Sequence, residues 1–276
     1  MKLSMWSSFL VELPPEEAMC EFVKHGYNGC DLSEEHSIVL LERGEAKTEG
    51  RKFKKFCDSI GMEVSQAHLS MRHMLCDDGA TDVLCRWLDL YEACGVKQAV
   101  LHLDYLNDSG LTTEEKREKN LEALKALTNH LEGSDVKIAL ENINGIFTTA
   151  DDLLWFIEKL GDEHLSICLD TGHLHHSDHP DQAAFIRRAG RHLRALHVHD
   201  NAGKTDQHYF PFAPTGTRII QKVTSINWQS VMTALREIGY SDLFNYEIPG
   251  ERIVPREILD AKLDYGKKIY DYLLTL

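Results

Sequence analysis

Short apolar segments alternate with amphipathic segments along the whole chain. Eight of the apolar segments are rich in Val, Ile and Leu, which is typical of strands that are buried on both faces. The predicted strands are Lys2–Trp6, Gly29–Leu32, Glu63–Leu69, Gln98–Leu103, Lys137–Glu141, Ser166–Asp170, Leu193–His199 and Leu243–Ile248.

The amphipathic segments between them predict helices with recognisable ends. Proline and acidic residues open the first at Pro14–Glu17, and Thr112 and Glu115 have the spacing of a capping box. Regular alternation of strand and helix indicates a parallel sheet. Eight such units need roughly 250 residues to close into a barrel. The chain has 276 residues, so we expect a single α/β domain, a (β/α)8 TIM barrel spanning residues 1–276.

Ionisable side chains mark the ends of six consecutive predicted strands, from the third to the eighth. Only 15 of the 276 residues are histidine, so chance is a poor explanation for this placement. In a barrel these strand ends converge on one face, where active sites lie. Imidazoles and carboxylates together suit zinc, manganese or iron better than calcium or magnesium. The candidate metal ligands are His68, His102, Glu141, Asp170, His173, His197, Asp206, His208 and Glu247.

Each of these residues also has a simpler interpretation, a structural role without metal. For the other histidines we adopt only this structural interpretation. A lone strand histidine is more often a hydrogen-bonded core residue, and an aspartate at a strand end often caps the next turn. His199 alternates with His197 and is expected to point away from the metal. His175, His176 and His179 are interpreted as a solvated loop. The remaining histidines, in or beside predicted helices, are interpreted as surface residues: His25, His36, His130, His164 and His192.

The composition is that of a soluble globular protein, with 43% hydrophobic and 27% charged residues. A formal net charge of −14 offers no basic footprint, which argues against a nucleic-acid partner. The seven cysteines form no Cys-x-x-Cys motif and fit reduced thiols. The apolar run at the N-terminus is too short for a signal peptide or a membrane span. We therefore expect a cytoplasmic protein with no membrane partner, and leave open whether it forms homo-oligomers.

Three motifs at the strand ends resemble those of one superfamily. They are Leu140-Glu141-Asn142, Leu169-Asp170-Thr171-Gly172-His173 and His197-Val198-His199-Asp200. In this combination and order the chain resembles the xylose-isomerase-like superfamily of TIM barrels, which unites sugar isomerases and epimerases with endonuclease IV. The resemblance extends over essentially the whole chain.

The resemblance implies two different metal arrangements. In the epimerases a quartet of side chains holds one ion and its two glutamates exchange protons with the substrate; the corresponding residues are Glu141, Asp170, His197 and Glu247. In endonuclease IV that quartet is enlarged to three zinc sites. The additional ions would be held by His68 and His102 with Glu141, and by His173, Asp206 and His208.

Two departures from endonuclease IV favour a small substrate. The segment after Glu141 lacks a long glycine-rich loop, and the segment after His208 is aromatic and apolar rather than basic. We therefore expect a metal-dependent isomerase or epimerase of a small sugar or sugar phosphate. One to three zinc, manganese or cobalt ions would be the cofactor, and Glu141, Glu247 and His173 the catalytic residues.

Several alternatives remain open at this point. A metal-dependent hydrolase with up to three zinc ions would use the full set of nine ligands. A keto-sugar dehydratase would share the step of proton abstraction, and a non-catalytic binding barrel would use none of this chemistry. Lys204 and Arg218, in the long connection after the seventh strand, are candidates to bind a substrate phosphate or carboxylate, or are solvated surface charges.

Overall fold

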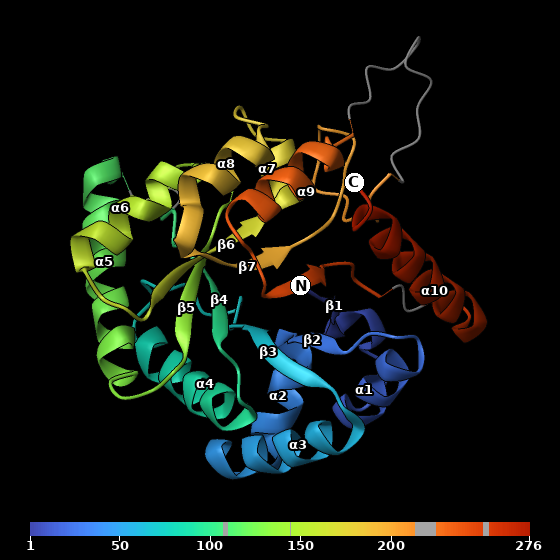
Figure 1. Ribbon diagram of the computed structural model, residues 1–276. Coiled ribbons are helices and arrows are strands. Elements are labelled where there is room, and N and C mark those ends of the chain that lie inside the picture. Colours follow the sequence, from blue (N-terminus) through green and yellow to red (C-terminus); the bar gives the residue numbers. More distant parts are fainter. Residues whose placement is uncertain (107–109, 144, 213–224, 251–253) are drawn as a thin grey trace.

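Eight parallel strands form the wall of a barrel in the computed structural model, which describes residues 1–106, 110–143, 145–212, 225–250 and 254–276 (Figure 1). Consecutive strands from β1 to β7 pair with one another, and β1 also pairs with β8. A parallel bridge between Val198 and Tyr246 joins the end of β7 to β8. The strands are β1 Lys2–Trp6, β2 Gly29–Leu32, β3 Glu63–His68, β4 Gln98–His102, β5 Lys137–Glu141, β6 Leu165–Asp170, β7 Leu193–His197 and β8 Leu243–Tyr246. The (β/α)8 prediction is confirmed.

Helices surround the strands (Figure 1). The capping box predicted at Thr112 and Glu115 is present, and Thr149 and Asp152 form a second one. No helix within the described ranges is long and apolar enough to cross a membrane. The helices are α1 Pro15–Lys24, α2 Glu34–Arg43, α3 Ala46–Ile60, α4 Ala80–Cys94, α5 Thr113–His130, α6 Ala150–Leu160, α7 Thr171–His175, α8 Gln182–Ala189, α9 Trp228–Glu237 and α10 Arg256–Leu273, with short 3-10 turns at Ser7–Leu10 and Gly190–His192.

Strand periodicity determines which side chains enter the barrel. A buried apolar cluster of small and medium side chains comes from β4 to β7. Its members each stand two residues before a strand-end residue, and side chains two apart in a strand lie on the same face. The cluster is Val100, Ala139, Cys168 and Ala195, and the strand-end residues are His102, Glu141, Asp170 and His197. These four side chains therefore rest on a packed apolar layer inside the barrel.

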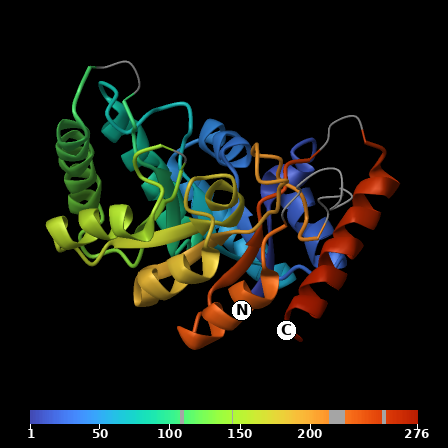
Figure 2. The same ribbon diagram turned by 90° about the horizontal axis from the view of Figure 1, so that it is seen from above.

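The loops that follow the strands lie on one side of the barrel. Figure 2 shows the connection after β3 on the side opposite both chain termini. Strand β7 ends two residues earlier than predicted. Val198 forms only an isolated bridge, and Asp200 pairs antiparallel with Tyr209. The chain thus leaves the barrel wall before His199.

Candidate metal centre

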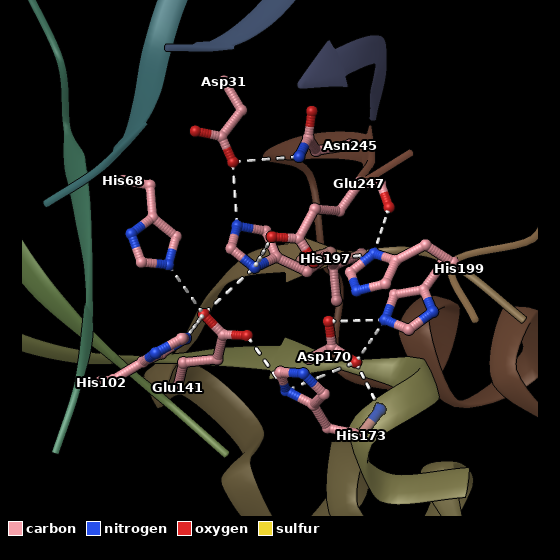
Figure 3. Close-up of polar contacts among 12 residues, drawn as sticks. Asp31, His68, His102, Glu141, Asp170, His173, His197, His199, Asn245 and Glu247 are labelled. Carbon is pink, nitrogen blue, oxygen red and sulfur yellow. Dashed lines mark hydrogen bonds and ion pairs between the residues drawn. The ribbon is translucent and has the colours of Figure 1, made fainter. Parts of the chain in front are cut away.

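Glu141 lies at the centre of a group of histidines at the carboxyl ends of the strands (Figure 3). The side chain is fully buried. Its Oε2 lies 3.1 Å from His102 Nε2, 3.1 Å from His197 Nδ1 and 3.5 Å from His68 Nε2. Its Oε1 lies 3.3 Å from His173 Nδ1. Strands β3, β4 and β7 and helix α7 thus bring four imidazoles to one carboxylate on β5.

The quartet Glu141, Asp170, His197 and Glu247 is assembled as the sequence predicts. One ligand atom from each residue lies within 4.8 Å of the corresponding atoms of the other three, and all four residues are buried. Glu247 Oε1 lies 3.4 Å from His197 Nδ1. His68 forms a second such group with Glu141 and His197. The described part of the chain therefore offers two overlapping sets of ligands around the same carboxylate.

A neighbouring cluster comes from α7 and the chain beyond β7. Asp206 Oδ2 lies 3.2 Å from His173 Nε2 and 3.0 Å from His208 Nε2. His199 also belongs to this cluster: its ring stacks on that of His208 with 3.8 Å between centroids, and its Nε2 lies 3.6 Å from Asp206 Oδ1. His173, Asp206 and His208 are therefore brought together as predicted, with His199 added.

The prediction that His199 points away from the ligands was wrong. Its Nε2 lies 2.9 Å from the carboxylate oxygens of Asp170. Strand alternation does not apply here, because β7 ends at His197. The ring packs against Gly172, where a Cβ atom would lie 1.9 Å from His199 Cε1. Glycine at position 172 is thus a condition for this placement.

Unsatisfied buried atoms test whether these groups fit a metal ion. Buried polar atoms normally have hydrogen-bond partners, and exceptions need an explanation. Among the residues that the structure describes, several buried polar atoms without a hydrogen bond belong to these clusters: His68 Nε2, Glu141 Oε1, His197 Nδ1 and Glu247 Oε2. All are donors of the kind that zinc, manganese and cobalt accept. The residues present therefore fit a divalent ion.

The two glutamates differ in their affinity for protons. Burial opposes charge on Glu141, but the nearby His197 and His102 outweigh this effect and hold its pKa well below the usual value. Burial dominates at Glu247 and raises its pKa to about 8. In the metal-free protein near neutral pH, Glu141 is therefore charged and Glu247 is mostly protonated.

The outer cluster is an ion-pair network in the absence of metal. Burial disfavours the charged form of His208, but its hydrogen bond with Asp206 raises its pKa to about 9. The same histidine, together with His173, lowers the pKa of Asp206 despite partial burial of this carboxyl group. The positive charge of the protonated histidines thus balances the Asp206 carboxylate, as a bound cation otherwise would.

Other predicted residues lie elsewhere. Lys204 is exposed, and Arg218 lies outside the described residues. His36, predicted to be at the surface, is buried, with its Nε2 3.0 Å from the Leu13 carbonyl oxygen. His175, predicted to be in a solvated loop, is a buried residue of α7. Asp31 was not among the predicted residues, yet it is a fully buried carboxylate 2.9 Å from His197 Nε2.

Residues 21–269 match the model of the xylose isomerase-like TIM barrel family. The chain belongs to this family. One relative, an uncharacterized protein y4fM of Sinorhizobium fredii, is 26% identical over 183 residues, which are 64% of this chain and 55% of that protein. Another, a D-psicose 3-epimerase of Enterocloster bolteae, is 27% identical over 128 residues, 45% of this chain and 37% of that protein. The matches thus span about half of these relatives or less.

Solved structures of sugar epimerases share the fold over nearly the full length. A D-psicose 3-epimerase from Clostridium cellulolyticum H10 has a TM-score of 0.78 at 16% identity, with 99% of each chain covered. The 3-keto-D-glucoside 4-epimerase YcjR from E. coli has a TM-score of 0.76 at 16% identity, covering 97% of this chain and 99% of that one. At such identities the likeness establishes the fold alone.

Proposed function

We propose that this chain is a metal-dependent isomerase or epimerase that moves a proton on a small sugar or sugar phosphate. The arrangement of the four oxygens of Glu141 and Glu247 supports this proposal. One oxygen of each faces His197 Nδ1, at 3.1 and 3.4 Å. Among the described residues, the other oxygen of each is buried without a hydrogen bond. Each glutamate thus has one oxygen for an ion and one for a proton.

A divalent ion would be held by Glu141, Asp170, His197 and Glu247, and when bound it supplies Lewis acidity toward a substrate carbonyl and its neighbouring hydroxyl. The chain itself supplies the proton transfer. One glutamate removes the proton from the carbon beside the carbonyl. The other returns a proton to the opposite face of the same carbon in an epimerase, or either returns it to the adjacent carbon in an isomerase.

His173 lies where it can assist this transfer. Its Nδ1 lies 3.0 Å from the Asn142 carbonyl oxygen and 3.3 Å from Glu141 Oε1. The Asn142 carbonyl oxygen accepts the Nδ1–H and so fixes the ring beside the Glu141 oxygen that we assign to the proton. His173 would thereby hold Glu141 in its reactive orientation, and we assign it a catalytic role. Exposed Lys204 is proposed to meet the substrate phosphate or carboxylate.

The relatives support a sugar as substrate. The curated D-psicose 3-epimerase and the solved epimerase structures are named for ketose or keto-glucoside substrates. The net charge of −14 argues against a polyanionic nucleic acid. A small keto-sugar therefore fits both the comparisons and the charge.

A metal-dependent hydrolase is the second candidate, because the cluster of His173, His199, Asp206 and His208 can hold an ion beyond the quartet. With His68 and His102 included, the described ligands suffice for up to three zinc ions. A keto-sugar dehydratase would share the proton abstraction that we assign to the glutamates.

The variant Asp206→Asn/His208→Ala separates the two candidates. Ions per chain are counted by elemental analysis on protein without a histidine tag, and ketose epimerisation and phosphodiester hydrolysis are measured on the same samples. We expect the variant to lose at most the outer ion and to retain epimerisation. Hydrolysis by the wild type that disappears in the variant, without epimerisation in either protein, would replace our proposal with the hydrolase.

A further inference from the structure

A buried carboxylate on β2, Asp31, lies on the far side of His197 from the two glutamates (Figure 3). It is fully buried. Its Oδ2 lies 2.9 Å from His197 Nε2, and it accepts hydrogen bonds from Gln66 Nε2 at 2.7 Å and from Asn245 Nδ2 at 3.0 Å. One oxygen atom therefore connects β2 with β3, β7 and β8.

The residues around Asp31 form further hydrogen bonds, and these bonds fix which of their atoms face the carboxylate. Ser4 Oγ donates to Asn245 Oδ1 at 2.8 Å, so the amide nitrogen of Asn245 faces Asp31. Gln66 Nε2 also donates to the Leu196 carbonyl oxygen, at 3.2 Å. Amide N–H groups only donate hydrogen bonds, so Asp31 Oδ2 is an acceptor toward both of its amide neighbours. The hydrogen between Asp31 and His197 is therefore on His197 Nε2.

We infer that Asp31 is a positioning residue, which holds His197 as the Nε2–H tautomer and so leaves the lone pair of Nδ1 free to bind an ion at the quartet. This inference rests on the proposed function, because it concerns the ion at the quartet. Within the described ranges His197 Nδ1 is buried without a hydrogen bond, and it lies between Glu141 and Glu247. The opposite tautomer would set a lone pair against the Asp31 carboxylate and a hydrogen against the ion.

The general behaviour of metal-bound histidine gives the size of the effect. Such a histidine usually donates its second N–H to a carboxylate or carbonyl, and losing that partner typically weakens metal binding by about 10–100-fold. Asp31→Asn keeps the shape and one acceptor oxygen but removes the charge. We expect it to raise the Kd for Mn²⁺ by about 10-fold or more and to lower kcat more than it changes KM for the ketose.

A purely structural Asp31 would lower stability without this selective effect. Ser166→Ala provides the matched control, because it removes another buried hydrogen bond inside the barrel, from Ser166 Oγ to Gln98 Oε1 at 2.6 Å. We expect this control to bind Mn²⁺ as the wild type does, although it loses some thermal stability. Titration calorimetry on chelator-treated proteins measures Kd, and calorimetric melting measures stability.

A measurement on the wild type alone covers the case in which Asp31→Asn fails to fold. Long-range ¹H–¹⁵N correlation spectra of Zn²⁺-loaded protein, with His197 assigned by mutation, report the tautomer. We expect the hydrogen on Nε2. A hydrogen on Nδ1, or an Asp31→Asn variant that binds Mn²⁺ within about twofold of the wild type, would overturn the role of Asp31 while leaving the proposed function intact. A wild type that binds no ion at all would instead refute the proposed function itself.

Discussion

The most informative perturbation compares two isosteric substitutions, Glu141→Gln and Glu247→Gln, in metal-free protein at pH 7. Both residues are buried members of the same quartet. Their charge states differ, because the pKa of Glu141 lies well below its usual value and that of Glu247 is raised to about 8. The two substitutions should therefore have unequal effects on stability, although both remove one carboxylate ligand.

The magnitude follows from what each side chain touches. Glu141 lies within 3.5 Å of four imidazoles, and removing one partner of a buried ion pair costs about 3–5 kcal/mol. Imidazoles can release their protons in response, so we expect the lower end, about 3 kcal/mol, or roughly 6–12 °C in Tm for a domain of this size. Glu247→Gln replaces a mostly neutral group with another and should stay within about 1 kcal/mol of the wild type, the size of one net hydrogen bond.

Differential scanning calorimetry on chelator-treated proteins measures this difference. Titration with Mn²⁺ on the same samples should show weakened binding in both variants. Equal Tm values for Glu141→Gln and the wild type, or a loss in Glu247→Gln as large as in Glu141→Gln, would refute the assignment of charge to the two glutamates.

Three further results are expected. Because the pKa values of Glu247 and His208 are raised in the folded chain, to about 8 and about 9, their contribution to stability is present at low pH and is lost as the pH rises. The Tm of metal-free protein should fall between pH 6.5 and 9 while that of metal-loaded protein changes less; a flat metal-free profile would count against the assigned pKa values. Gly172→Ala should displace the His199 ring and weaken Zn²⁺ binding by the outer cluster more than binding by the quartet, which titration of metal-free protein would show; Zn²⁺ binding identical to that of the wild type would contradict this. Lys204→Ala should raise KM for a phosphorylated ketose and leave KM for the unphosphorylated sugar unchanged, as steady-state kinetics on both would test.

The barrel and most candidate ligands could be predicted because both depend on local patterns. Alternation of strand and helix gives the fold, and a polar residue at the end of an apolar strand is visible without knowing its neighbours. Glu141 and Asp170 each end such a strand, and the structure places both in the quartet. Parallel strands then bring these ends together, so one topological rule assembles the site.

The residues that could not be predicted depend on contacts between distant segments. His199 was misplaced because period-two reasoning was extended past the point where β7 ends, at His197. Asp31 stands among buried residues of a short strand, and its importance comes from its contact with His197, which lies on another strand. His36 was predicted to lie at the surface, yet its side chain contacts the Leu13 carbonyl. Sequence periodicity does not report any of these tertiary contacts.

The central claim is that Glu141 and Glu247 exchange a carbon-bound proton of a keto-sugar. It is tested most directly by NMR in D₂O, with Mn²⁺-loaded protein and a panel of ketoses and their phosphates. We expect the wild type to place solvent deuterium on the carbon beside the carbonyl of at least one sugar, and Glu141→Gln and Glu247→Gln to lose this exchange by about 10²–10⁴-fold. Deuterium incorporation by either variant at the wild-type rate, or its absence from every sugar in the panel with fully loaded wild type, would contradict the claim.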